Sequence, residues 1–138
     1  MKTAYPMFFT LTNSGEYLIC SPDIPSAKTQ GENLYDAILM ARDVLSLCIV
    51  TMEDNNEEIP KPSNIEELDV SKGIFSTEGS TIISFVDIDT EDYRKKINQQ
   101  AVRRNVALPG WLDYQANKSG INVSRLLQDA LIEKLNLK

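Results

Sequence analysis

The chain has 138 residues, of which 42% are hydrophobic and 25% are charged, a composition typical of one globular domain or two small ones. It contains no histidine, which excludes Ser-His-Asp and Cys-His triads, histidine metal sites and imidazole acid–base chemistry. Its two cysteines, Cys20 and Cys48, are too few for a disulfide framework or a zinc site. No apolar stretch approaches the roughly 18–20 residues that span a bilayer, and the first residues make a poor signal peptide. We therefore expect a cytoplasmic protein.

The net charge of −6 is distributed unevenly along the chain. Residues 1–92 hold 17 acidic and five basic residues, a net charge of −12. Residues 93–138 hold three acidic and nine basic residues, a net charge of +6. This division predicts two domains whose partners differ in charge, although a solvated acidic domain followed by a basic tail would give the same count.

The N-terminal segment predicts three short strands. Residues 5–12 and 16–20 are rich in β-formers, and the turn residues at 13–15 between them predict a hairpin. Two prolines three residues apart make the next stretch an irregular loop. Residues 26–30 then form a short third strand that ends at Gly31.

A long helix follows. Apolar residues recur at helical spacing from Leu34 to Met52, which predicts a helix at about 33–54. Asn33 is the expected N-cap, and Asp36 takes the position of the acid in a capping box. The second half of this helix is apolar nearly all round, so we expect it to be covered on more than one side.

The middle of the chain completes the first domain. The acidic stretch 53–69 contains two prolines and predicts a surface connection. Residues 80–88 form a β-rich run with apolar residues in both phases, which favours a central position in the sheet. We therefore predict an α+β fold with the order β-β-β-α-β in residues 1–92, followed by a polar linker at 93–100.

The basic segment predicts one more strand. Residues 101–108 end at a proline, and Val106 and Leu108 alternate with Asn105 and Ala107, which is strand periodicity. A lone strand is an unpaired edge. It needs a partner strand from elsewhere.

Two short helices follow this strand. Pro109 is expected at the N1 position of a helix at about 109–119, and Gly120 ends that helix. Asn122 or Ser124 caps the last helix. The apolar face of the last helix consists of Val123, Leu126, Leu127, Ala130, Leu131 and Leu135.

So short a segment cannot bury these apolar faces alone. We therefore predict that two copies pair their strands antiparallel and interlock their helices. The resulting two-stranded ribbon would fit the major groove of DNA.

The features that identify this segment are Arg103–Pro109, then Trp111 and Leu112, then Ser119–Ser124, then Leu127, Ala130 and Leu131. In this order they resemble the ribbon-helix-helix family of DNA-binding domains. The resemblance implies a homodimer, the dimerisation and DNA-binding domain being residues 101–138. It also implies that Asn122, Val123 and Ser124 bind a DNA phosphate at the start of the last helix.

The resemblance assigns base contacts to alternate strand residues. Arg103, Asn105 and Ala107 would face DNA: an arginine can contact guanine, an asparagine can contact adenine, and an alanine offers a methyl group. Arg104 has the inward phase but lies near the strand start, where it would reach a phosphate. The alternative is a ribbon that only dimerises and leaves its arginines solvated.

The N-terminal pattern consists of Tyr5-Pro6, Gly15–Tyr17, Ser21–Pro25, Thr29–Asn33, and Ala37 and Ala41 on the long helix. It resembles the HicB antitoxins of the HicA–HicB toxin–antitoxin systems. The resemblance implies a partial RNase H-like domain that binds a HicA-type toxin, a small basic mRNA-cleaving protein, and masks its catalytic histidine. It also implies that the antitoxin represses its own operon through the DNA-binding domain.

The expected toxin contacts are Ser21, Pro22, Asp23, Asp87 and Asp89, on the loop at 21–31 and at the acidic end of the last strand. The charge of −12 fits a basic partner independently, because complementary potentials speed encounter and exclude wrong partners. Steric masking needs no catalytic residue, cofactor or metal, and we predict none. A higher oligomer through N-terminal contacts stays open.

The sequence leaves two other function classes as alternatives. A nuclease of RNase H type would need carboxylates that converge on metal ions, and Asp23, Asp36, Asp87 and Asp89 are the candidates. Capping or solvation explains these residues more simply. The second alternative is a ribbon-helix-helix transcriptional repressor whose N-terminal domain senses a metabolite.

Overall fold

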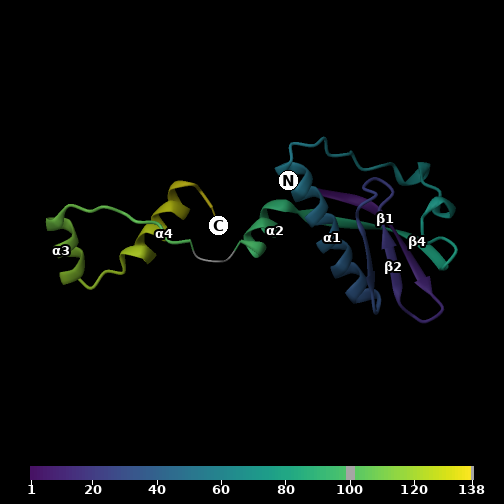
Figure 1. Ribbon diagram of the computed structural model, residues 1–138, viewed down its shortest axis with the longest axis horizontal. Helices are drawn as coiled ribbons and strands as arrows, with labels where there is room; N and C mark the ends of the chain where they lie inside the picture. Colours follow the sequence, from purple (N-terminus) through teal and green to yellow (C-terminus); the bar gives the residue numbers. More distant parts are fainter. Residues whose placement is uncertain (99–101, 138) are drawn as a thin grey trace. The chain divides into compact units, whose positions relative to one another are not determined.

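The computed structural model describes residues 1–98 and 102–137, and it divides the chain into two compact units, Met1–Gln99 and Gln100–Lys138 (Figure 1). The first unit contains, in chain order, β1 (Lys2–Thr12), β2 (Tyr17–Cys20), β3 (Lys28–Gly31), α1 (Leu34–Asp54), β4 (Gly79–Asp89) and α2 (Thr90–Ile97). Two 3-10 turns, Ile65–Glu67 and Val70–Lys72, lie between α1 and β4. The second unit contains α3 (Gly110–Lys118) and α4 (Val123–Lys134).

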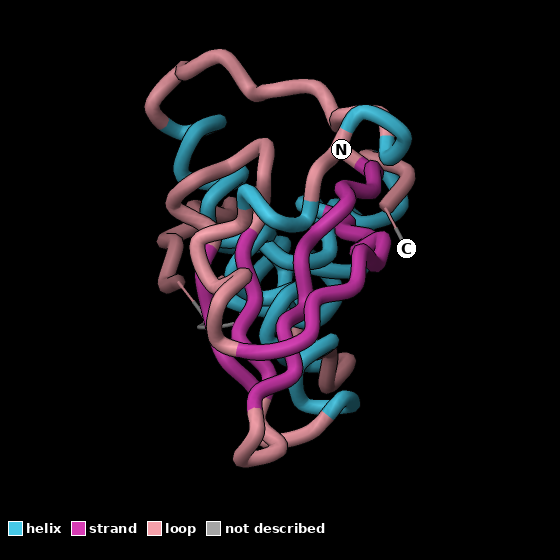
Figure 2. Tube along the Cα trace, turned by 90° about the vertical axis from the view of Figure 1, so that its right-hand side faces the viewer, coloured by secondary structure: helices cyan, strands magenta, loops and turns pink. Residues whose placement is uncertain are grey.

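The four strands form one antiparallel sheet in the order β3-β2-β1-β4, drawn in magenta in Figure 2. The predicted hairpin and third strand are confirmed. Phe8 of β1 lies opposite Cys20 on one side and Ile83 on the other. The first unit is therefore an α+β fold with the predicted element order.

The predicted central position of the last strand is wrong, because β4 is an edge strand. Its apolar residues do occupy both phases, but only some of them are covered. Val86 and Ile88 are buried beneath α1, whereas Ile82 is 55% exposed and Phe85 is 61% exposed. A two-phase apolar pattern therefore does not require hydrogen-bonded neighbours on both sides.

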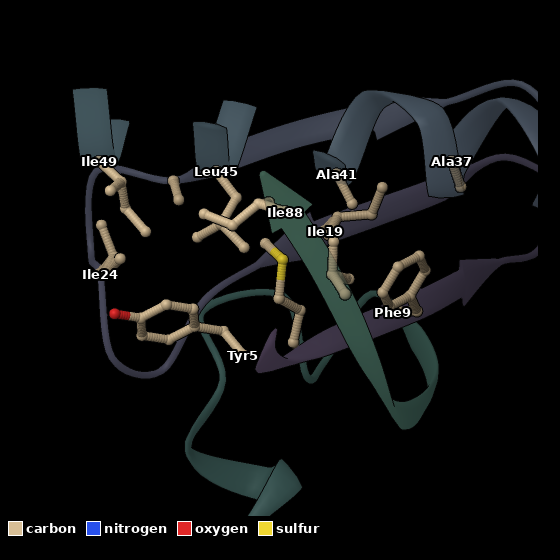
Figure 3. Packing of buried hydrophobic residues seen from close by; sticks show 12 residues of the cluster. Tyr5, Phe9, Ile19, Ile24, Ala37, Ala41, Leu45, Ile49 and Ile88 are labelled. Atoms are coloured by element: carbon tan, nitrogen blue, oxygen red, sulfur yellow. The ribbon is translucent and has the colours of Figure 1, made fainter. Parts of the chain in front are cut away.

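One face of the sheet packs against α1. Ala37, Ala41, Leu45 and Ile49 recur every fourth residue and form a fully buried stripe along the helix. Figure 3 shows this stripe directed toward the side chains of the sheet, among them Tyr5, Phe9 and Ile19. The two larger side chains of this stripe, Leu45 and Ile49, each contribute roughly 1.5–3 kcal/mol through their burial.

The part of the opposite face formed by β1 is covered by the segment 55–78, which links α1 to β4. Phe8 is only 4% exposed, and a Cβ at Gly73 would lie 2.8 Å from its ring. On the α1 side of the sheet, the Tyr5 hydroxyl donates a hydrogen bond to the carbonyl of Pro60 in the same segment. The connection predicted from its acidic residues and prolines therefore packs on β1, which is buried on both faces.

The start of α1 agrees closely with the prediction. Asn33 caps the helix, and its side chain accepts a hydrogen bond from the Asp36 N–H at 2.9 Å. The Asp36 carboxylate accepts from the Glu32 N–H at 2.9 Å, one residue before the donor of a standard capping box. Gly31 is required here, because a Cβ would lie 2.5 Å from the backbone of Ala37.

The second half of α1 is less covered than predicted. Ile49 and Val50 are buried, but Leu47 is 49% exposed. The end of α1 instead contacts α2 through ion pairs. Arg94 lies 2.9 Å from a carboxylate oxygen of Asp54 and 3.6 Å from one of Glu53. Most of α2 comes from the first residues of the predicted linker at 93–100. The structure packs this helix against α1, within the first unit.

In the second unit, both helix boundaries follow local signals. Pro109 is the N-cap of α3 rather than its first residue. Gly120 has a φ of +69°, and its N–H and that of Ile121 bond the carbonyls of Asn117 and Ala116, which is a Schellman motif. Of the two predicted caps of α4, Asn122 is the one observed, and its side chain accepts a hydrogen bond from the Arg125 N–H at 3.1 Å.

The strand predicted at 101–108 is not formed in the described part of that segment, residues 102–108. Residue 101 lies outside the described residues. A strand is defined by its hydrogen-bonded neighbour, and the single chain supplies none to these residues.

Candidate functional site

Two of the five predicted toxin contacts hold a loop in place. Ser21 is only 6% exposed, and its hydroxyl oxygen accepts a hydrogen bond from the Ile24 N–H at 3.0 Å. Asp23 accepts from the Ser63 N–H at 3.0 Å and also from the Ser63 hydroxyl. These bonds fix the loop at 21–27 and join it to the segment 55–78. Sequence reasoning missed this role, because no local pattern pairs residues 40 positions apart.

The other two acidic residues lie near α1 and α2. Asp87 accepts hydrogen bonds from the Arg42 guanidinium at 2.9 and 3.0 Å, and these bonds lower the pKa of the Asp87 carboxyl. Asp89 is the N-cap of α2 and accepts from the N–H groups of Glu91 and Asp92 at 3.1 and 3.3 Å. Both carboxylates stay partly solvent-accessible, so they can also meet a partner.

A groove of about 710 Å³ contains Asp87 and Asp89. Its walls come from α1, α2 and the adjoining ends of β1 and β4. Its charged residues are Lys2, Arg42, Asp43, Asp87, Asp89, Asp92 and Lys96. Leu39, Ile97 and Tyr93 add apolar surface between these charges. The groove can therefore take both a basic and an apolar side chain of a partner.

A second depression, of about 390 Å³, contains Ser21 and Pro22. It lies between the loop at 21–27 and the segment 55–78, with Phe8, Leu68 and Ile74 among its apolar residues. Ser21 and Pro22 thus line one depression and Asp87 and Asp89 line the other. The structure does not gather the predicted toxin contacts into one site.

The burial of Cys20 affects the chemistry of this second depression. Cys20 lines it and is 6% exposed, and burial raises the pKa of its thiol. A thiol held neutral is a weak nucleophile. Cys48 is half-buried and also free.

The carboxylates that a nuclease would need are not brought together. Asp23 bonds Ser63, Asp36 bonds the backbone at the start of α1, and Asp87 bonds Arg42. Among residues 1–98 and 102–137, no group of three acidic or cysteine side chains could hold a metal ion. The arrangement offers surfaces for binding rather than a two-metal centre.

The predicted DNA contacts fall on two parts of the second unit. Arg103, Arg104, Asn105 and Ala107 lie on the exposed segment 102–109, which has no regular secondary structure in the single chain. Asn122, Val123 and Ser124 lie together at the start of α4. Free N–H groups at this helix end favour an anion such as phosphate.

The helices of the second unit expose their apolar side chains. Every described residue of this unit is exposed except Ala116, which is half-buried. Trp111 is 70% exposed, Leu126 is 56% exposed and Leu131 is 50% exposed. The unit as a single chain has no buried core.

Among the described residues of the whole chain, no helix has both the length and the apolar character to cross a membrane.

Comparison with known proteins identifies the family. A model described as the HicB-like antitoxin of bacterial toxin-antitoxin system matches residues 5–130. Antitoxin HicB of Escherichia coli K12 is 30% identical over 105 residues, covering 76% of this chain and 73% of that protein.

Solved structures agree with this match. A toxin-antitoxin complex from Streptococcus pneumoniae contains a chain with 25% identity and a TM-score of 0.63, covering 97% of this chain and 99% of its own. The N-terminal domain of Burkholderia pseudomallei antitoxin HicB has 25% identity and a TM-score of 0.52, covering 63% of this chain and 99% of its own. The chain therefore belongs to the HicB-like antitoxin family.

Proposed function

We propose that the first unit binds and masks a HicA-type mRNA interferase toxin, while the second unit binds operator DNA as a ribbon-helix-helix homodimer and represses the operon. The single observation that carries this proposal is the family match, which spans residues 5–130 and so includes parts of both units. The two proposed targets are a toxin that cleaves mRNA and operator DNA. Both lie in the cytoplasm, so we place this chain there as well.

The shape and charge of the first unit support toxin binding. Its β-β-β-α-β order is the arrangement of a partial RNase H-like domain, and its residues 1–92 carry a net charge of −12. The partner named by the relatives is a toxin. We assign the direct contacts to the groove with Asp87 and Asp89, and we assign Ser21, Pro22 and Asp23 to a supporting role that fixes the neighbouring loop.

The exposed apolar faces of the second unit support a dimer. Leu127 and Leu131 lie one turn apart on α4, and each is exposed in the single chain. A second copy would bury them and would also supply a partner strand to residues 102–108. Arg103 and Asn105 would then face DNA from the paired strands.

Separation of the two activities by point mutation tests the proposal. Arg103→Ala should weaken operator binding about 5- to 150-fold, because a bidentate contact to a base is worth roughly 1–3 kcal/mol. It should leave toxin neutralisation in co-expression assays unchanged. Asp87→Lys should have the opposite effects, weakening neutralisation and sparing operator binding. If Arg103→Ala abolished neutralisation and kept DNA binding, the assignment would be reversed.

Salt dependence provides a second measurement. Operator affinity should fall steeply between low and high salt, because contacts to phosphate release bound counterions. A binding signal that is insensitive to salt would argue against a basic DNA ribbon.

Residues 1–98 alone should still protect cells against the cognate toxin, since they contain the buried core and the groove.

A further inference from the structure

The second depression has the size and the interior of a small-molecule pocket. Its volume of about 390 Å³ lies within the range of roughly 300–1,000 Å³ that is usual for such pockets. Phe8 and Cys20 lie opposite one another on β1 and β2, and both side chains are buried. The apolar residues that line the depression are Phe8, Cys20, Pro22, Pro25, Leu68 and Ile74. The interior can therefore receive an apolar group.

Both walls of the second depression are held by hydrogen bonds within the single chain. On one side, Asp23 joins the loop at 21–27 to Ser63, as described above. On the other side, Asp69 caps a 3-10 turn by accepting from the Ser71 N–H at 3.0 Å and from the Ser71 hydroxyl at 2.6 Å. Walls that are already ordered lose little conformational freedom when a ligand binds.

Basic residues are concentrated at this depression. Residues 1–92 contain five basic residues, and two of them, Lys28 and Lys72, line it. Within residues 1–98, neither of these ammonium groups takes part in an ion pair. Burial raises the pKa of the Cys20 thiol, and Lys28 is close enough to oppose that rise. The charge of Lys28 therefore lies near the apolar interior.

Two acidic residues also line the depression, but neither forms an ion pair with these lysines. The bonds from Ser71 hold the Asp69 carboxylate within its own turn and lower its pKa, to which Lys72 adds a smaller effect. Glu67 is exposed, and its carboxylate accepts no hydrogen bond within residues 1–98. The lining charges that no bond holds are thus two positive and one negative, which favours an anion.

We propose that the second depression binds a small carboxylic acid with an apolar body, such as an aromatic carboxylate. The apolar body lies against Phe8 and Leu68, and the carboxylate faces the ammonium groups of Lys28 and Lys72. A ligand seated in this way contacts both walls and adds to the bonds that join them. The site shares no lining residue with the groove of about 710 Å³, and it does not rest on toxin or DNA binding.

Binding of benzoate to the full-length protein tests the site. In heteronuclear NMR spectra, the backbone N–H signals of Gly73 and Ile74 should shift and saturate as benzoate is added. Benzamide has the same shape without the charge and should bind about tenfold more weakly. Each ammonium group at about 4 Å from a carboxylate is worth about fivefold in water, and Glu67 opposes them. Acetate carries the charge without the ring and should give no saturable shift.

Lysine variants provide a matched comparison. Lys28→Gln and Lys72→Gln should each weaken benzoate binding about fivefold, because each removes one positive charge. Both should leave benzamide binding unchanged, since the apolar interior is retained. Lys61→Gln is the control, because Lys61 lies on the same segment as Lys72 but does not line the depression. It should bind benzoate as the unmodified protein does.

Four results would overturn the proposal. Absence of a saturable shift at Gly73 and Ile74 would show that the depression takes no such ligand. Equal affinity for benzoate and benzamide would show that the lysines do not recognise the carboxylate. Shifts confined to residues 102–137 would place the binding on the exposed leucines of α4. If Lys28→Gln lost toxin neutralisation and the unmodified protein bound no benzoate, the depression would be a toxin contact instead.

Discussion

The two units of this chain differ in where their apolar residues lie. In the first unit, β1 is buried on both faces and α1 contributes a continuous stripe to the core. In the second, the leucines of α4 are exposed and Ala116 alone among the described residues is half-buried. The first unit has a core made of its own contacts, whereas the second leaves its apolar surface exposed in the single chain, where we propose that a second copy covers it. Similar helical patterns in a sequence can therefore indicate an internal core or an intermolecular one.

The largest expected effect tests the intermolecular core. Leu131→Asp should place a carboxylate in the dimer interface, where burial of an unpaired charge is costly. We expect operator affinity to fall by about 100-fold or more, as for the central residues of an interface. Electrophoretic mobility shift measures the loss, and Gln128→Asp on the same helix is the control. Unchanged operator binding by Leu131→Asp would contradict the dimeric core.

The next effect tests the internal core. Leu45→Ala removes a fully buried side chain from the stripe on α1 and should lower the free energy of unfolding by about 2–5 kcal/mol. Urea unfolding monitored by circular dichroism measures this change. Operator binding should be retained at temperatures where the first unit is still folded. A loss of operator binding there would show that the units depend on one another.

A smaller effect tests the link between the loop at 21–27 and the segment 55–78. Asp23→Asn keeps the size of the side chain but weakens the two bonds from Ser63, at a cost of about 1 kcal/mol. Ser63→Ala should have a similar effect, and the double variant should add little to either single one. Fully additive losses of unfolding free energy would show that the two residues act separately.

The smallest effect concerns pH. Because Arg42 lowers the pKa of Asp87 below its unfolded value of 3.8, the ion pair adds stability above that pH and loses it as the pH falls through the folded pKa. Both side chains are well exposed, so the contribution is small. Asp87→Asn should slightly flatten the acid side of the stability profile, below about pH 4. An equal loss at about pH 2 and at pH 7 would indicate a packing effect instead, because the ion pair no longer contributes below both pKa values.

Local signals predicted much of the fold. The turn residues before Tyr17 and the cap at Asn33 each act within a few positions, so the hairpin and the start of α1 could be identified from the sequence. Gly120 and Asn122 marked the end of α3 and the start of α4 in the same way. Pro109 was misplaced by one position, because a proline is equally compatible with the residue before a helix.

Long-range contacts could not be predicted in this way. β4 is an edge strand because β1 is its one neighbour in the sheet. The order of apolar and polar residues within β4 carries no information about how many strands lie beside it. The packing of the segment 55–78 on Phe8 was missed, because an acidic stretch with prolines has no periodicity. For the same reason, the predicted toxin contacts could be named but not grouped into the two depressions that the structure shows.

The pairing of β1 with β4 has a consequence for synthesis on the ribosome. Lys2 lies opposite Asp89, so the first strand to be made acquires its second neighbour only when the last strand of the unit has emerged. Until then the backbone groups along one edge of β1 have no hydrogen-bonding partner, and the strand itself contains Phe8 and Phe9. Contacts this distant in the chain form slowly. A nascent chain that stalls before Gly79 would thus expose an apolar strand with an unpaired edge, which chaperones and proteases can bind.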